Sequence, residues 1–257
     1  MKTLLFAVLF LIINALHSQV LIHSHNDYEK PEPLFNALRN YAFAIEADVH
    51  LVNGKLLVSH DLENVDPKRT LSAMYLDPLD SLFKQNKGWV SADKNYKPTL
   101  VVDIKADGEL VIDLLIKLLA AKPQTFDRKI NPAAIQVIIS GDRGAIAKWK
   151  TYPSIIMFDG RPSEVYDRNT LAKVVTISES YEKYYHDNVM HLDSLQLMIA
   201  QSHNLKKLVR IWGAPDFPST WKRFTDLGID IINTDKIAEC WKMFPSGTAI
   251  SAGAKAL

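Results

Sequence analysis

The sequence predicts a single α/β domain, a barrel of eight parallel strands surrounded by helices. Short apolar and β-branched runs alternate with longer segments of helical spacing, the pattern of a parallel sheet wrapped by helices. The length of 257 residues suits one such barrel, and no linker, repeat or low-complexity stretch divides the chain. We therefore expect a (β/α)8 TIM-type barrel over residues 19–245, preceded by a leader at residues 1–18 and followed by a tail at residues 246–257.

Nine runs are strand candidates, one more than the barrel needs: Val20–His23, Ala42–Asp48, Lys55–Ser59, Thr99–Ile104, Ile135–Ser140, Ser154–Phe158, Val174–Ile177, Leu208–Trp212 and Ile229–Asn233. The pair Asn53-Gly54, between the second and third candidates, is typical of a two-residue hairpin turn. One of these two strands is therefore expected to be an antiparallel addition to the barrel. The segments with helical spacing include Gly108–Leu119, Ala145–Lys150, Ser194–His203 and Pro218–Leu227.

The N-terminus has the pattern of a secretory signal peptide. Met1-Lys2 is followed by an apolar run from Leu4 to Leu16, which is too short to span a bilayer comfortably. A buried N-terminal helix is the alternative, although the run shows no amphipathic pattern. We expect a protein exported to the periplasm or the extracellular space, without a transmembrane segment.

The bulk composition is that of an ordinary globular domain and excludes some partners. The net charge is +1 and no block of like charge occurs, so a nucleic-acid surface or a polybasic membrane patch is not expected. Cys240 is the single cysteine, which rules out a disulfide within the chain. The last residues, 246–257, follow no pattern and are expected to be a loosely ordered end.

Polar residues gather where the predicted strands end, which is where a barrel of this kind carries its catalytic groups. Glu46 and Asp48 are two residues apart on one strand, so both side chains face the barrel interior. Asp103 repeats this position on a later strand and completes a set of three carboxylates. Inward carboxylates this close need a counter-charge, and an all-oxygen set suits Mg²⁺ or Ca²⁺. A salt bridge to a lysine or arginine is the alternative.

Three further residues suggest the chemistry of such a site. Lys105 lies on the same strand face as Asp103 and could hold an anionic group; a lysine beside a hard cation favours a phosphate ester as substrate. His23 and His60 follow two of the strands, and imidazoles titrate near neutral pH, which suits one as acid and one as base. Asp159 and Arg161, after another strand, carry a weaker signal for substrate contact.

The motifs "HSHNDY", "IEADVHL", "LLVSHD", "VVDIK", "VRIWGAP" and "IDIINTD" occur in an order that resembles the glycerophosphodiester phosphodiesterases and related phosphatidylinositol-phospholipase-C-like barrels. The resemblance runs from about residue 20 to residue 235. It implies catalytic roles for His23 and His60, metal ligation by Glu46, Asp48 and Asp103, and substrate contacts from Lys105 and Trp212. It also implies a small-molecule or lipid-derived phosphodiester as substrate, and in related barrels the substrate's own hydroxyl is often the nucleophile.

The chain departs from the family pattern at three positions. Ser24 stands where the family has a phosphate-binding arginine, His25 where it has glycine, and Asp103 is one methylene shorter than the usual glutamate. His25 or Asn26 is the candidate to replace the arginine. The opening resembles a divergent branch of these enzymes.

Two other readings remain open. The His-x-His pattern of His23 and His25 also marks zinc-dependent amidohydrolases, in which both histidines bind metal and Asp235 would supply the final-strand carboxylate. The predicted fourth to sixth strands offer none of the further histidines that those enzymes need. A catalytically inactive barrel that binds a ligand is the second reading, and the presence of two histidines with three carboxylates argues against it.

Overall fold

The computed structural model describes residues 20–244, and the predicted leader at residues 1–18 and the tail at residues 246–257 lie outside the described residues. Eleven strands occur in this part of the chain: β1 Leu21–Ser24, β2 Ala44–Val52, β3 Lys55–Val58, β4 Thr99–Ile104, β5 Gln136–Gly141, β6 Ile156–Gly160, β7 Val174–Ser180, β8 Tyr185–His186, β9 Val189–Met190, β10 Leu208–Trp212 and β11 Ile231–Thr234. The nine predicted strands are all present, with ends that shift by a few residues.

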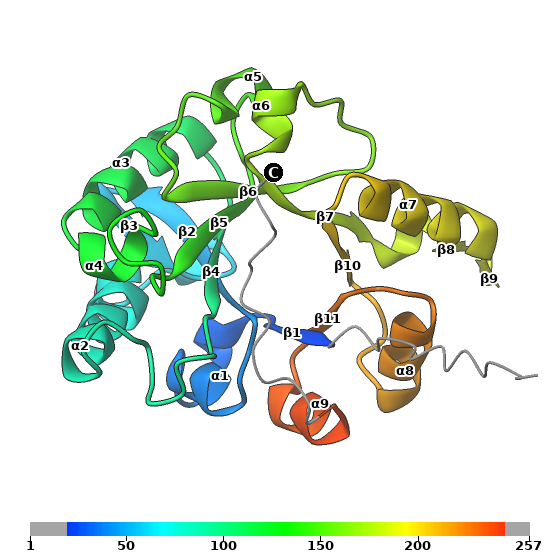
Figure 1. Cartoon of the computed structure of the whole chain (residues 1–257), viewed down its shortest axis with the longest axis horizontal. Helices are drawn as coiled ribbons and strands as arrows, with labels where there is room; N and C mark the ends of the chain where they lie inside the picture. The colour runs from blue at the N-terminus through cyan, green and yellow to red at the C-terminus, as the bar shows by residue number, and fades with distance from the viewer. Residues whose placement is uncertain (1–19, 245–257) are drawn as a thin grey trace, which may run out of the picture.

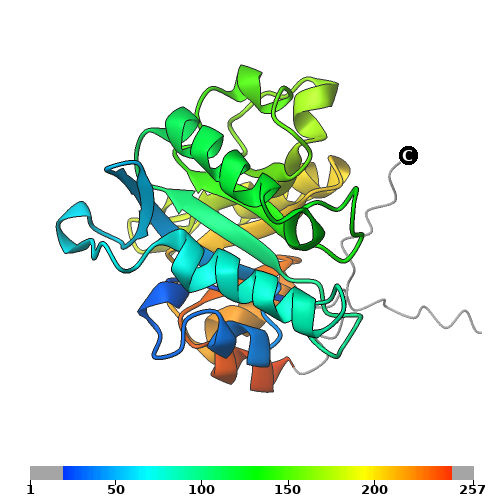
Figure 2. The same cartoon turned by 90° about the vertical axis from the view of Figure 1, so that its left-hand side faces the viewer.

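Eight of these strands close into a parallel barrel, as predicted. The sheet runs β1-β11-β10-β7-β6-β5-β4-β2-β3, and β1 also pairs with β2 to complete the ring (Figure 1). The ninth strand of this sheet, β3, lies outside the ring and pairs antiparallel with β2. Asn53 and Gly54 both have positive φ, at 49° and 73°, as the predicted hairpin turn requires. The hairpin therefore extends β2 beyond the barrel (Figure 2).

Helices cover the outside of the ring, as Figure 1 shows. The α-helices are α1 Phe35–Arg39, α2 Asp77–Gln85, α3 Gly108–Ala120, α4 Pro123–Phe126, α5 Ile146–Trp149, α6 Arg168–Leu171, α7 Leu192–Asn204, α8 Pro218–Asp226 and α9 Ile237–Met243. Short 3-10 or π segments are η1 Asp27–Glu29, η2 Leu62–Asn64, η3 Ser72–Leu76 and η4 Tyr181–Lys183. The four predicted helices are α3, α5, α7 and α8. None of the helices in residues 20–244 is long and apolar enough to cross a membrane.

The apolar residues form two cores, one on each side of the barrel wall. The larger lies between the strands and the helices and includes Trp149, Phe158 and Trp221. The smaller fills part of the barrel interior and includes Phe43, Val101, Ile138 and Ile231. Side chains that alternate along a strand face these two regions in turn, so an inward polar residue above the small core is held on a rigid wall.

Candidate active site

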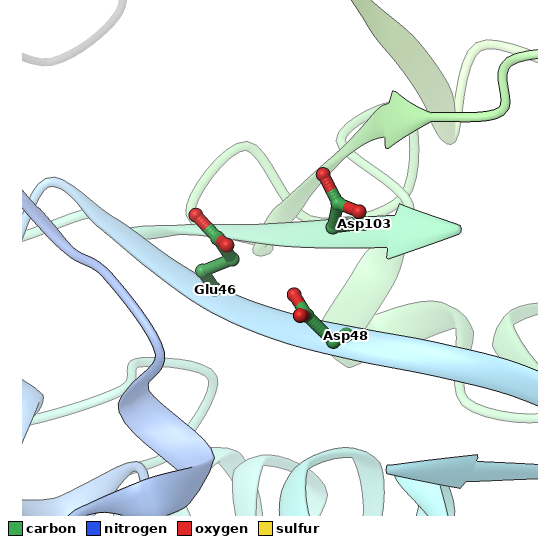
Figure 3. Close-up of side chains that lie close together, drawn as sticks. All are labelled: Glu46, Asp48 and Asp103. Carbon is green, nitrogen blue, oxygen red and sulfur yellow. The ribbon is translucent and has the colours of Figure 1, made fainter. Parts of the chain in front are cut away.

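Glu46 and Asp48 on β2 come together with Asp103, the next-to-last residue of β4. Asp48 is paired in register with Asp103, and one oxygen from each of the three carboxylates lies within 4.8 Å of the others. Figure 3 shows the three side chains projecting from the same side of the two strands. Glu46 and Asp48 are buried and Asp103 is partly exposed. The strand alternation therefore produces the predicted acidic cluster.

The two oxygens of Asp48 have different surroundings. Oδ2 receives donors from Tyr28 Oη at 2.8 Å, His60 Nδ1 at 3.0 Å and Lys105 Nζ at 2.6 Å. Oδ1 is buried and has no hydrogen-bond partner within the described residues. Burial and the charge of Glu46 raise the pKa of Asp48 despite Lys105. A buried carboxylate oxygen without a donor is costly, and a hard cation is a partner that fits it.

Lys105 lies between two of the carboxylates. Its Nζ is 2.6 Å from Asp48 and 3.0 Å from Asp103. Burial alone would lower the pKa of Lys105, but the charges of Asp103 and Asp48 outweigh burial and raise it. The ammonium group is therefore charged, and the salt bridge considered as an alternative to a cation is present beside the cluster. One lysine does not balance three carboxylates.

His23 is held by Glu46 inside the barrel. The His23 ring is 2% exposed, and its Nε2 lies in a short contact with Glu46 Oε2. Burial and the charge of Arg210 lower the pKa of His23, and the Glu46 carboxylate only partly offsets them. A neutral ring that donates from Nε2 keeps Nδ1 as its acceptor. His23 is thus in the form of a base.

His60 lies on the other side of the cluster and is open to solvent. It follows β3, its Nδ1 is 3.0 Å from Asp48 Oδ2, and 58% of its side chain is exposed. The carboxylate accepts a hydrogen bond from Nδ1–H, which leaves Nε2 as the nitrogen that can exchange a proton with a ligand. The two histidines predicted for catalysis therefore flank the same cluster, His23 at Glu46 and His60 at Asp48.

Arg210 is a residue of the site that the sequence reasoning missed. It lies on β10, and its Nη1 is 3.7 Å from Glu46 Oε2 and 3.4 Å from His23 Nε2. Its Nη2 is 2.8 Å from Asp159. Arg210 interrupts the apolar alternation of "LVRIW", and a charge at an inward strand position was the signal that could have found it.

Tyr28 was also missed, although it belongs to the "HNDY" motif. Its buried hydroxyl contacts Asp48, and it lies 3.0 Å from Asn26 Oδ1. The neighbouring Asp27 is fully buried and accepts hydrogen bonds from Ser24 Oγ at 3.1 Å and Tyr75 Oη at 2.9 Å. The motif thus builds a loop that supports Asp48, and the Ser24 hydroxyl is used within that loop.

The remaining predicted substrate contacts lie at the mouth of the barrel. His25 follows β1, and its Nδ1 is 3.2 Å from Asp235 Oδ1. Asn26 has a left-handed backbone, with φ of 46°, and Trp212 ends β10 with 37% of its surface exposed. His25 and Asp235 bind each other. The group within residues 20–244 that could hold a metal ion is the set of three carboxylates, Glu46, Asp48 and Asp103. The geometry favours this set over a His-x-His zinc site.

Comparison with known proteins places this TIM-type barrel among the phosphodiesterase-like domains. A family model described as AIM6-like phosphodiesterase domain matches residues 14–142, just over half of the chain, and the protein belongs to this family. The glycerophosphodiester phosphodiesterase of Parabacteroides distasonis has the same fold, with a TM-score of 0.58, 16% identity, and coverage of 89% of this chain and 98% of that one.

Other known proteins resemble this chain in fold or in sequence. The Oleispira antarctica phosphodiesterase, solved with its product sn-glycerol-3-phosphate, has a TM-score of 0.53 at 15% identity and covers 88% of this chain and 96% of that one. The proteins called Altered inheritance of mitochondria protein 6 from Eremothecium gossypii and Lachancea thermotolerans are 26% and 28% identical. These matches cover 84% and 85% of this chain, which spans 67% and 64% of those proteins' length.

Proposed function

We propose that this protein is an exported, metal-dependent phosphoric diester hydrolase that acts on glycerophosphodiesters or phospholipid-like phosphodiesters. The family membership supports a phosphodiesterase, and the apolar run from Leu4 to Leu16 supports export. The observation that carries the chemistry is Asp48, which clusters with Glu46 and Asp103 and whose buried Oδ1 has no donor among residues 20–244. An oxygen in this state fits a cation and is unusual in a purely structural carboxylate.

Glu46, Asp48 and Asp103 would hold a divalent cation, Mg²⁺ or Ca²⁺ by the chemistry of their oxygens. When bound, such an ion withdraws negative charge from a nonbridging phosphate oxygen and eases attack at phosphorus. Lys105 already lies beside two of these carboxylates, so its ammonium group is placed to contact the same phosphate. Asn26 and Trp212, at the mouth, are positioned to contact the alcohol portions of the diester.

His23 and His60 are the acid/base pair in this proposal. One ring takes a proton from the attacking hydroxyl while the other gives a proton to the leaving alkoxide oxygen. Burial and the charge of Arg210 lower the pKa of His23, which favours His23 as the base. His60 is exposed and has Nε2 available, which favours it as the acid at the leaving group.

The test is turnover of bis(p-nitrophenyl) phosphate and of glycerophosphodiesters by the purified protein, after EDTA treatment and then with Mg²⁺, Ca²⁺ or Zn²⁺ restored. We expect rescue by Mg²⁺ or Ca²⁺. His60→Gln should lower kcat by about 10²–10⁴-fold and leave cation binding intact. His203→Gln is the matched control, because His203 also pairs with an aspartate but lies away from the site. Its partner, Asp230, is 2.9 Å away and directly precedes β11.

Three outcomes would contradict the proposal. Turnover with Zn²⁺ alone would restore the His-x-His reading. Cation binding with no turnover of any diester would point to a ligand-binding barrel. Full activity of the His60→Gln variant would remove His60 from the mechanism.

A further inference from the structure

Beside the acidic cluster, the ends of β1 and β11 carry a second charged group, formed by His25, Lys30 and Asp235. His25 Nδ1 is 3.2 Å and Lys30 Nζ is 3.0 Å from the same oxygen, Asp235 Oδ1. Side-chain exposure is 33% for His25, 18% for Lys30 and 48% for Asp235. Two basic side chains thus share a single carboxylate at the open end of the barrel.

The backbone places this group next to the acidic cluster. His23 pairs with Ala44 and Ser24 with Ile45 in the β1–β2 register, so His25 comes level with Glu46. His25 is two residues after His23, so its side chain faces the same side of the strand. His23 contacts Glu46 on that side. The His25 backbone N–H donates to Thr234 O at 3.1 Å, which fixes the end of β1 against β11.

The charges near the site are unevenly matched. Lys105 is shared by two carboxylates, and Arg210 is bound to Asp159 and lies close to Glu46. His25 and Lys30 have one carboxylate between them, Asp235, just as Arg210 and Arg161 share Asp159. A set of three carboxylates, one lysine and one divalent cation is neutral, and beside it the group of His25, Lys30 and Asp235 carries one net positive charge when His25 is protonated.

We propose that His25 and Lys30 form an anion subsite that takes a nonbridging oxygen of the phosphate bound at the acidic cluster. The inference rests on the proposed function, since it adds a second contact to the same phosphate. With Nδ1 bound to Asp235, the imidazolium has Nε2–H left as a donor. Asp235 is a positioning residue in this subsite, and its own backbone N–H is fixed by Asp216 Oδ2 at 3.0 Å.

The electrostatics of the surrounding groups agree with this geometry. Burial lowers the pKa of His25, as does the charge of Arg210, but the hydrogen bond to Asp235 and the charges of Glu46 and Asp235 raise it by more. The same hydrogen bond, together with Lys30, lowers the pKa of Asp235 to about 2. Both shifts favour the ion pair of imidazolium and carboxylate.

The experiment is calorimetric titration of the Mg²⁺-loaded full chain with inorganic phosphate, which reads the subsite without turnover. We expect His25→Gln to weaken phosphate binding about tenfold or more, because a hydrogen bond to a charged group contributes about 1.5–3 kcal/mol. Lys30→Met should weaken it in the same direction. His203→Gln, the matched control at the other end of the barrel, should bind phosphate as the wild type does.

A further variant tests the positioning role of Asp235. Wild-type phosphate affinity should fall as pH rises through the raised pKa of His25, and Asp235→Asn should move that fall to lower pH. Thermal unfolding of each variant tests whether the barrel is intact.

Equal phosphate binding by His25→Gln, Lys30→Met and His203→Gln would overturn the subsite, and so would a wild type that binds no phosphate. The two proposals fail separately. Phosphate binding that depends on His25, without hydrolysis of any diester, would contradict the proposed function and support the subsite. Hydrolysis of a diester, with unchanged phosphate affinity in His25→Gln, would support the proposed function and contradict the subsite.

Discussion

Asp48 and Asp159 are both buried aspartates on the inner wall of the same barrel, yet their surroundings are opposite. Every described contact of Asp159 is a donor: Thr176 at Oδ1, and Ser140, Ser178, Arg161 and Arg210 at Oδ2. Within the described part of the chain, Asp48 has three donors on Oδ2 and none on Oδ1. Asp159 is 1% exposed and Asp48 is 0% exposed, so a difference in burial does not explain the difference in their contacts.

The ionisation of the two groups follows from this difference. Burial opposes the charge of Asp159, but Arg210 and Arg161 outweigh it and hold the pKa of that carboxyl well below its usual range. Burial and Glu46 raise the pKa of Asp48, and Lys105 does not offset them. Asp159 has donors on both oxygens, whereas Asp48 pairs with Lys105 through Oδ2 and has no described partner at Oδ1. The incomplete group is the functional candidate.

The largest expected effect is on stability, from Asp159→Ala. This change leaves Arg210 and Arg161 without their buried carboxylate, and breaking a buried ion pair from one side costs about 3–5 kcal/mol. Urea unfolding of the metal-free protein measures it. The lowered pKa gives a second check: this contribution is present above the unfolded pKa of an aspartate and is lost as pH falls toward the lower folded value. An Asp159→Ala variant as stable as the wild type would contradict the structural role assigned to Asp159.

Asp48→Asn should affect activity and leave stability nearly unchanged. Loss of the free carboxylate oxygen is expected to lower kcat/KM by about 10²–10³-fold with Mg²⁺, roughly 3–4 kcal/mol of barrier. Without metal, the free energy of unfolding at neutral pH should stay the same or rise slightly, because the raised pKa shows that the folded state disfavours the charge at this position.

The control for Asp48→Asn is Asp226→Asn, an exposed aspartate on α8 that pairs with Lys222 at 2.8 Å. This variant should change neither activity nor stability by much, since exposed pairs contribute little. A marked loss of stability in Asp48→Asn, with activity retained, would make Asp48 a structural residue like Asp159.

The features predictable from the sequence are those that depend on local alternation. The strands, the hairpin at Asn53-Gly54 and the shared face of Glu46 and Asp48 all follow from a period of two and from turn chemistry. Helix α2, over Asp77–Gln85, went unpredicted even though it buries Leu79 and Phe83. Short helices such as α1 and α6 have too few residues for a periodic signal, and packing against the barrel stabilises them.

The contacts that the sequence could not provide are those between strands far apart in the chain. Arg210 reaches His23 across 187 positions, and Asp235 reaches His25 across 210. These pairings depend on barrel closure and on side-chain reach, which no spacing rule contains. Strand alternation does place Arg210 on the inner face, but its partners become known only when β10 is placed beside β11 and near β1.

The smallest effect, and the sharpest test of why Asp48 keeps one oxygen free, comes from Tyr28→Phe. Burial and the nearby Asp48 charge raise the pKa of Tyr28 far above its usual value, so its hydroxyl stays a donor to Oδ2. Removing it should weaken cation binding about tenfold, the lower end of what supporting residues contribute to metal sites. Calorimetric titration with Mg²⁺ measures the change.

Tyr75→Phe is the matched control for this prediction, because the Tyr75 hydroxyl binds Asp27 in the same loop and does not touch the cluster. Both variants lose one buried hydrogen bond and should lose about 1 kcal/mol of stability. A reduced Mg²⁺ affinity in Tyr28→Phe alone would show that the hydroxyl orients Asp48. Equal losses of affinity in both variants would instead assign the effect to the loop as a whole, and the free oxygen of Asp48 would then depend on the packing of "HSHNDY" against β2 and not on a single donor.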